Sequence, residues 1–188
     1  MKTLAFRTFL EEKIASLPAT DLSDKLDSKA CVAAILRGHS IEDLEVGFIR
    51  RAISPMDKWS GQIAFPGGRK EEADEDDFAT TAREVREEIG MTLTRHDLLG
   101  HLHDVQARKA GGLMNFFIRP LVFYIDREEP LLLDPAEVDE FFWIRLSHLR
   151  DDQFKTTVEG FPAIQLHRDP PLWGLTYLMT TDLLGRLI

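Results

Sequence analysis

The chain has 188 residues, of which 44% are hydrophobic and 29% are charged, and its formal net charge is −9. This length fits one domain, residues 1–188, with a substantial core, and the composition excludes intrinsic disorder. The apolar runs are too short to cross a bilayer, and the acidic balance argues against broad contact with nucleic acid. We therefore expect a cytoplasmic protein whose partners include neither a membrane nor a nucleic acid.

The first elements predicted along the chain are a helix and two strands. Apolar side chains recur at helical spacing within residues 1–28, which should form an N-terminal helix and a connecting segment. These apolar side chains are Phe6, Leu10, Ile14 and Leu17. Residues 30–36 and 44–53 read as strands. The single cysteine, Cys31, lies in the first of them, which predicts a buried thiol without a catalytic role.

Short apolar runs predict further strands, which dominate the middle of the chain. They cover residues 62–65, 98–105, 115–125, 140–144 and 161–166. A final helix has an apolar face. That face comprises Leu172, Leu175, Met179 and Leu183. We expect an α+β fold in which helices pack on a central mixed sheet.

A helix predicted over residues 78–89 concentrates carboxylates on one face. Glu84, Glu87 and Glu88 stand at i, i+3 and i+4, so their Cβ atoms should lie within about 5–6 Å of one another. Like charges repel at this spacing, unless divalent cations such as Mg²⁺ or Mn²⁺ lie between them and bridge them to substrate phosphates. A solvated helix face would mix charges of both signs more evenly. The pattern therefore predicts a site for metal and diphosphate.

The two ends of this helix are also signalled. Asp76 or Asp77 can cap its start, and Gly90 is a natural left-handed terminator. The acidic run before the helix is expected to be a solvated loop, except for Glu75.

Residues 68–91 resemble the Nudix box of the Nudix hydrolase superfamily. The box reads Gly, five residues, Glu, seven residues, then Arg-Glu-apolar-any-Glu-Glu-any-Gly-apolar. This chain has every fixed residue type, with one extra residue after Gly68. Counting strictly from Gly68 would select Asp74 as the first acidic residue but would misplace Arg83, so we assign that position to Glu75. The resemblance implies an α/β/α sandwich that hydrolyses a diphosphate bond.

The resemblance also implies a ligand set, in which Glu84, Glu87, Glu88 and the Gly67 carbonyl hold Mg²⁺ or Mn²⁺. Arg83 is expected to orient these carboxylates through bidentate hydrogen bonds. Two readings of Glu75 stay open, one in which it pairs with Arg83 and one in which it reaches a metal through water.

The reaction also needs a base and groups that bind the substrate. A box glutamate or Glu137 could take the proton of the attacking water, and the residues alone do not select between them. Arg50, Arg51 and Lys58 are candidates for contacting phosphates, together with Gly68 of the box. Because side chains alternate along a strand, at most one of Arg50 and Arg51 should face a common site.

The longer loop and the sequence Phe65-Pro66-Gly67-Gly68 are similar to the coenzyme A diphosphatase branch of this superfamily. Its upstream signature is matched only in part, since Arg51 takes an arginine position but Ala52 replaces a serine and Trp59 a histidine. The similarity implies coenzyme A or acyl-CoA as the substrate, with 3′-phosphoadenosine 5′-phosphate and phosphopantetheine as the products.

Several alternatives stay open at this point. ADP-ribose, dinucleotides, sugar nucleotides and nucleoside triphosphates are other small-molecule substrates of this chemical type. A non-catalytic nucleotide-binding regulatory module would have no need of all three glutamates. An isoprenoid diphosphate isomerase would require a catalytic cysteine, whereas Cys31 is expected to be buried. The six histidines are interpreted as structural, and the resemblance admits a homodimer.

Overall fold

The computed structural model describes residues 2–26, 29–55, 59–109 and 112–188. Its helices are α1 (Lys2–Ala15), α2 (Asp77–Ile89), α3 (Leu146–Arg150) and α4 (Gly174–Leu187), with a 3-10 turn at Asp152–Phe154. Its strands are β1 (Lys29–Arg37), β2 (Glu45–Arg51), β3 (Ile63–Ala64), β4 (Gly67–Arg69), β5 (Leu98–His101), β6 (Val105–Lys109), β7 (Gly112–Tyr124), β8 (Val138–Arg145), β9 (Lys155–Val158), β10 (Phe161–Ile164) and β11 (Leu172–Trp173). No helix in these described ranges is long and apolar enough to cross a membrane.

The central sheet is organised around β1, which runs parallel to β7. On the other side of β1, β4 pairs antiparallel with its first half and β2 with its end. The β2 strand also pairs with β8, and β7 pairs with β5 and β6. Residues 30–36 of β1 are all buried, because both faces of the sheet are covered here. Strands β9, β10 and β11 form a separate small sheet.

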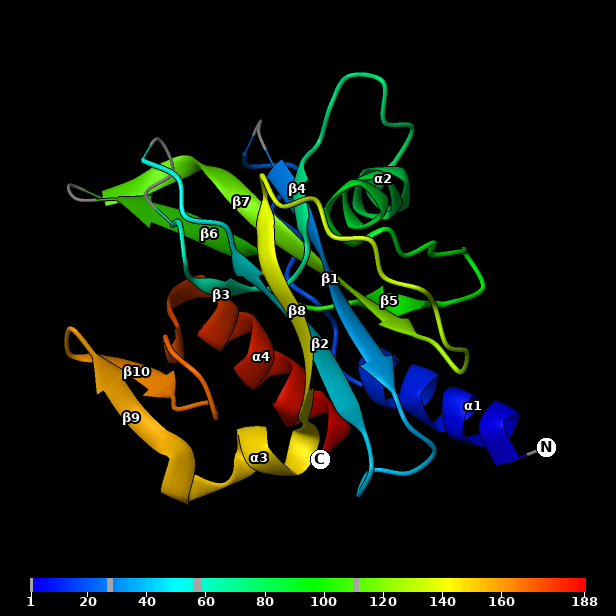
Figure 1. The fold of residues 1–188 in the computed structure, drawn as a ribbon. Coiled ribbons are helices and arrows are strands. Elements are labelled where there is room, and N and C mark those ends of the chain that lie inside the picture. The colour runs from blue at the N-terminus through cyan, green and yellow to red at the C-terminus, as the bar shows by residue number, and fades with distance from the viewer. Residues whose placement is uncertain (1, 27–28, 56–58, 110–111) are drawn as a thin grey trace.

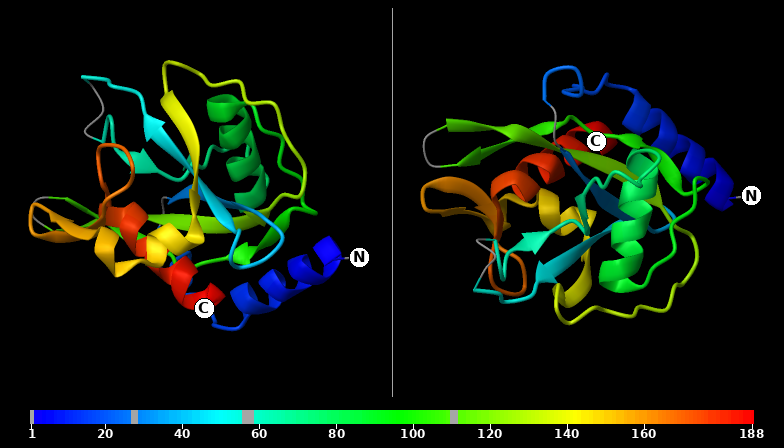
Figure 2. Two further views of the ribbon diagram at one scale, coloured as in Figure 1. Left: turned by 60° about the horizontal axis from the view of Figure 1, so that its bottom comes forward. Right: turned by 90° about the horizontal axis from the view of Figure 1, so that it is seen from above.

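Helices cover both faces of the central sheet, with α2 on one side and α1 and α4 on the other (Figures 1 and 2). Each side has its own apolar core. Leu10 of α1 and Leu183 of α4 belong to one core, whereas Val85 and Ile89 of α2 belong to the other. This arrangement confirms the α+β class and the α/β/α layering with a mixed sheet.

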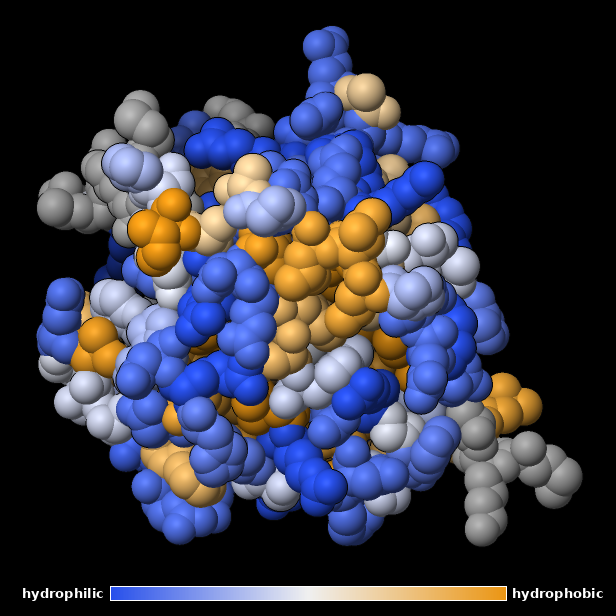
Figure 3. Space-filling model, in the orientation of Figure 1, coloured by the Kyte–Doolittle hydropathy of each residue, from blue (hydrophilic) through white to orange (hydrophobic). Residues whose placement is uncertain are grey.

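The surface seen in Figure 3 is largely hydrophilic, with a hydrophobic area near its centre, where β8 lies in Figure 1. Two aromatic side chains of β8, Phe141 and Trp143, are only partly buried, and they meet edge to face with ring centroids 5.1 Å apart. Gly47 of β2 lies against them, so the second core reaches the surface at this strand.

The predicted strands differ from the observed ones at one or both ends, and two of the differences have a visible cause. The expected strand over 98–105 is divided into β5 and β6, because the intervening Asp104 is buried and its amide donates to Thr20 rather than to a neighbouring strand. The expected strand over 44–53 ends at Arg51, after an irregularity between Arg50 and Arg51 that shifts the pairing with β8. Strand β4 was not predicted, because its Gly-Gly-Arg sequence carries no apolar alternation.

Candidate active site

Helix α2 and strand β4 place the predicted site residues. The Asp76 carboxylate caps α2 by accepting a 2.8 Å hydrogen bond from the Ala79 amide. Gly90 ends the helix at φ +73°, and its amide donates to the Arg86 carbonyl. Both helix ends are therefore where the sequence predicts them. The three glutamates follow within the last two turns of α2, so the helix axis fixes where they point.

Two glycines allow β4 to approach both β1 and α2 closely. Gly67 has φ +139°, and a Cβ atom there would overlap the Cys31 carbonyl of β1. A Cβ atom on Gly68 would overlap the Glu84 carboxylate. Because any side chain would fill this space, the double glycine is what brings the β4 backbone up to the helix carboxylates.

Glu88 is the most buried of the three glutamates, with only 2% of its surface exposed. Its Oε2 accepts a 2.7 Å hydrogen bond from the Gly67 amide. Burial, helped by the negative charges of Glu84 and Glu137, raises the pKa of Glu88 to about 8 despite this bond and the nearby Arg51. Burial is also the main cause that raises the pKa of Glu84. The site therefore holds carboxyl groups whose ionised form is disfavoured in the absence of a cation.

Arg83 joins the loop before α2 to the glutamates on the helix. Its Nε and Nη2 donate to the two carboxylate oxygens of Asp74, at 3.0 and 2.9 Å. Its Nη1 donates to Glu84 at 3.0 Å and to Glu87 at 3.1 Å, and Nη2 also donates to the Arg69 carbonyl. One guanidinium thus holds carboxylates from both the loop and the helix, as expected of a residue that orients them.

On the loop before α2, Arg83 pairs with Asp74 and not with Glu75, so the structure contradicts one of the two readings left open for Glu75. The loop turns between Glu71 and Asp74, with the Asp74 amide donating to the Glu71 carbonyl and the Glu71 amide donating back to the Asp74 carboxylate. This turn buries the Asp74 side chain to 6% exposure, whereas Glu75 is exposed. Strict counting from Gly68 selects Asp74, and the extra residue of the box therefore lies between Asp74 and Arg83.

The remaining candidates divide into those whose charges act on these glutamates and those that are paired elsewhere. The negative charge of Glu137 helps to raise the pKa of Glu88, and the positive charge of Arg51 acts to lower it. The Ala52 amide donates to the Glu137 carbonyl, so β2 and the loop before β8 are joined beside the site. Arg50 instead pairs with Asp139 at 2.7 Å and with Glu140 at 3.4 Å. Lys58 lies outside the described residues.

The donor set suits a hard divalent cation, because it consists of carboxylate oxygens that are partly or fully removed from water. Within the described ranges, however, no three acidic, histidine or cysteine side chains form a group that could hold a metal ion in this arrangement. Glu84 and Glu87 share the Arg83 guanidinium, while Glu88 turns to the Gly67 amide. Each of these hydrogen bonds uses one carboxylate oxygen, so a cation would require the three glutamates to converge with their other oxygens.

Comparisons with known proteins give a consistent family match. Residues 28–163 match the family model described as the NUDIX domain. The mitochondrial coenzyme A diphosphatase NUDT8 of Homo sapiens is 31% identical over 134 residues, which are 64% of this chain and 53% of that protein. The peroxisomal coenzyme A diphosphatase ndx-8 of Caenorhabditis elegans is 28% identical over 198 residues, covering all of this chain and 82% of that protein.

Among solved structures, a MutT NUDIX hydrolase from Burkholderia pseudomallei superposes with a TM-score of 0.57 at 21% identity. The superposition covers 82% of this chain and 96% of that one. The match confirms the sandwich fold that the box resemblance implies. The chain spans about half the length of the human relative and most of the length of the nematode relative.

We predict that Asp74→Asn destabilises the protein whereas Glu75→Gln does not. The first change weakens a bidentate, largely buried bond to Arg83 and should lower the free energy of unfolding by about 1.5–3 kcal/mol, a range typical of hydrogen bonds to charged groups. Urea unfolding of both variants measures the difference. If Glu75→Gln lowered the free energy of unfolding by the same amount, the first acidic position of the box would have to be assigned to Glu75.

We also predict that Glu88 makes the metal-free protein less stable as pH rises. Its folded pKa is about 8 against an ordinary value of 4.5, so between these values the unfolded chain releases a proton that the folded chain keeps. In the presence of a chelator, we therefore compare the melting temperatures of Glu88→Gln and the wild type. The difference, variant minus wild type, should become more positive from pH 5 to pH 8.

The matched control is Glu87→Gln, which removes the same charge from a side chain that is 57% exposed. Its melting temperature relative to the wild type should change much less over this pH range. If the two variants behaved alike, burial of Glu88 would not be the cause of the change in stability with pH.

Proposed function

The chain belongs to the Nudix family of hydrolases, which act on phosphoanhydride bonds, and on that premise we propose that it uses Mg²⁺ or Mn²⁺ to hydrolyse the diphosphate bond of a nucleoside diphosphate derivative. The observation that carries this proposal is the burial of Glu84 and Glu88 against the Gly67-Gly68 backbone, with Glu87 one turn from Glu84. Burying ionised groups costs free energy, so three carboxylates on a helix beside a tightly packed main-chain turn do not stabilise the fold. A functional role explains their presence better.

We assign the metal to Glu84, Glu87, Glu88 and the Gly67 carbonyl. When bound, the cation would neutralise the diphosphate oxygens and make an attacking water more acidic. Arg83 then keeps the glutamates oriented through its bond to Asp74, as its present hydrogen bonds suggest. Gly68 leaves the room that Glu84 needs, which gives it a role in shaping the site.

Two other side chains receive roles from their position. The charge of Arg51 acts on Glu88, and we assign Arg51 to the substrate phosphates. Arg50 binds two carboxylates of β8 and receives no role in the site. Glu137 approaches the same glutamates from the loop before β8 and is our candidate for the general base, with the helix glutamates as the alternative. Lys58 keeps the phosphate-binding role that the sequence suggests.

For the substrate we propose coenzyme A or acyl-CoA, cleaved to 3′-phosphoadenosine 5′-phosphate and phosphopantetheine. Two relatives whose names state coenzyme A diphosphatase activity support this choice, and one of them aligns over the whole chain. Those two relatives are named as mitochondrial and peroxisomal, so a cytoplasmic location stays a prediction for this chain. A homodimer and the absence of nucleic acid as a partner also stay predictions.

Replacing Glu88 or Glu84 by Gln should abolish most turnover while leaving the protein folded. Each change keeps the side-chain shape but removes a charge that metal binding requires, so kcat should fall about a hundredfold or more with Mg²⁺ or Mn²⁺. Glu137→Gln should also lower kcat, and if Glu137 is the base it should flatten the acid limb of the pH profile, because a protonated carboxyl group cannot accept the proton of the attacking water. Unchanged kcat in the Glu84 and Glu88 variants would remove these residues from the site.

The substrate assignment is tested by turnover on a panel of diphosphates followed by mass analysis of the products. We expect coenzyme A to be cleaved with a higher kcat/KM than ADP-ribose, a dinucleotide, a sugar nucleotide or a nucleoside triphosphate. The coenzyme A products should have the masses of 3′-phosphoadenosine 5′-phosphate and phosphopantetheine. Cleavage of ADP-ribose without cleavage of coenzyme A would overturn the choice of substrate and leave the hydrolase proposal intact.

A further inference from the structure

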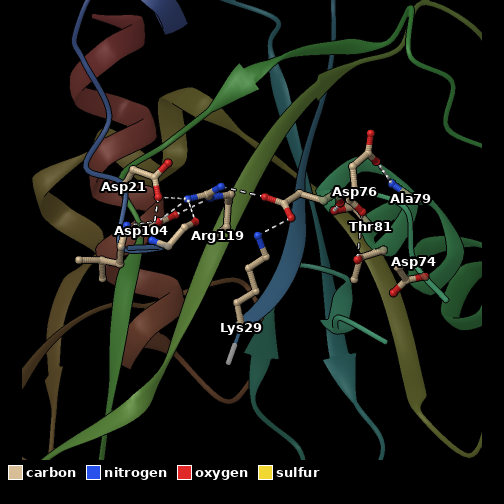
Figure 4. Close-up of polar contacts among 12 residues, drawn as sticks. Asp21, Lys29, Asp74, Asp76, Ala79, Thr81, Asp104 and Arg119 are labelled. Carbon is tan, nitrogen blue, oxygen red and sulfur yellow. Dashed lines mark hydrogen bonds and ion pairs between the residues drawn. The ribbon is translucent and has the colours of Figure 1, made fainter. Parts of the chain in front are cut away.

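Arg119, near the middle of β7, is the centre of an ion-pair network outside the site described above. It is 9% exposed and lies among three aspartates (Figure 4). Its Nε and Nη2 donate to both oxygens of Asp104, at 2.8 and 2.7 Å. Nη2 also donates to Asp21 at 2.6 Å, and Nη1 donates to Asp77 at 2.8 Å. The three carboxylates come from three separate segments of the chain.

One side of the network fastens the segment between α1 and β1. The Asp104 carboxylate accepts from the Leu22 amide at 2.8 Å as well as from Arg119, and its side chain is fully buried. The Asp104 amide donates to the Thr20 carbonyl. Ser23 adds a hydroxyl that accepts from Arg119 at 3.1 Å. Residues 20–23 are therefore docked on the turn before β6 through both main chain and side chains.

The other side of the network holds the start of the helix that carries the glutamates. Asp77 is the first residue of α2, and its two carboxylate oxygens bind Lys29 of β1 at 2.6 Å and Arg119 at 2.8 Å. The helix is thus tied at its first turn to two strands of the central sheet. Figure 4 shows Lys29 and Arg119 reaching toward the beginning of this helix from neighbouring strands.

The bonds leave little freedom for the guanidinium. Arg119 donates in a fixed fork, and the bidentate bond to Asp104 sets the plane of that fork. The pair is largely removed from water, so a displaced or missing partner would leave a charge without compensation. The positions of Asp21 and Asp77 are consequently set by the same guanidinium. The family match begins at residue 28, so Asp21 and Ser23 lie outside it.

We propose that Arg119 is a positioning residue that couples residues 20–23 to the placement of α2, and so to the placement of Glu84, Glu87 and Glu88. A helix rises 1.5 Å per residue, so Glu84 lies about 10 Å along the axis from Asp77. A shift of the first turn is carried to the glutamates by the rigid helix. The segment before the family module thereby tunes the metal site. This consequence for metal binding rests on the proposed function, whereas the fastening of α2 does not.

The test uses the full chain and conservative changes, because Arg119→Ala would leave the buried Asp104 carboxylate without a compensating positive charge. Asp21→Asn and Asp77→Asn each remove one charge that faces Arg119. The matched control is Asp24→Asn, which removes the same charge from an exposed side chain of the same segment. Arg119→Lys keeps the charge and removes the fork.

The first readout is hydrogen exchange of the α2 amides in metal-free protein. We expect faster exchange in α2 for Asp77→Asn, for Arg119→Lys and, to a smaller extent, for Asp21→Asn, with the control equal to the wild type. The double variant Asp21→Asn with Asp77→Asn should differ from the sum of the single effects, because both act through one side chain. Unchanged α2 exchange in Asp77→Asn would overturn the proposal, whatever the metal result.

The second readout is the dissociation constant of Mn²⁺ without any substrate. It is measured from the electron paramagnetic resonance signal of the free ion. Asp77→Asn and Asp21→Asn should raise it by about two- to tenfold, a range typical of residues that couple two sites without touching the ligand. A purely structural role would leave it unchanged in folded protein, and that result would refute the coupling. A wild type that binds no Mn²⁺ would instead refute the proposed metal site, while the exchange result would still decide whether the network fastens α2.

Discussion

The structure depends on the close approach of a glycine turn to a row of carboxylates. Gly67 and Gly68 bring the β4 backbone against Glu84 and Glu88, and the Gly67 amide supplies the hydrogen bond that Glu88 accepts. Burial raises the pKa of both glutamates, so the arrangement is costly for the folded chain by itself. A cation that binds both carboxylates would remove that cost, which connects the packing directly to the proposed chemistry.

The surrounding contacts keep this unfavourable arrangement in place. Arg83 binds Asp74 on the loop and reaches Glu84 and Glu87 on the helix, so loop and helix are held together. At the other end of α2, Asp77 is bound by cations from two strands. The helix that presents the glutamates is therefore held to the rest of the fold at its start and near its middle by charge-assisted bonds.

The sequence predicts much of this fold because its signals are local. The apolar run 30–36, the cap at Asp76 and the terminator Gly90 each act through neighbouring residues, and each is found where expected. The loop partner of Arg83 could not be identified from sequence, because the turn between Glu71 and Asp74 decides that Asp74 is buried and Glu75 is not. The Arg119 network was not foreseen because Asp21, Asp77 and Asp104 are distant in the chain, and no spacing rule relates them.

The central claim is that Glu84, Glu87 and Glu88 hold a divalent cation beside the β4 glycines. The most direct measurement is anomalous diffraction from crystals soaked in Mn²⁺ together with a diphosphate ligand. The account predicts a manganese peak in contact with these carboxylates, with Arg83 still bound to Asp74. Crystals that contain the ligand but show no manganese beside the three glutamates would contradict it.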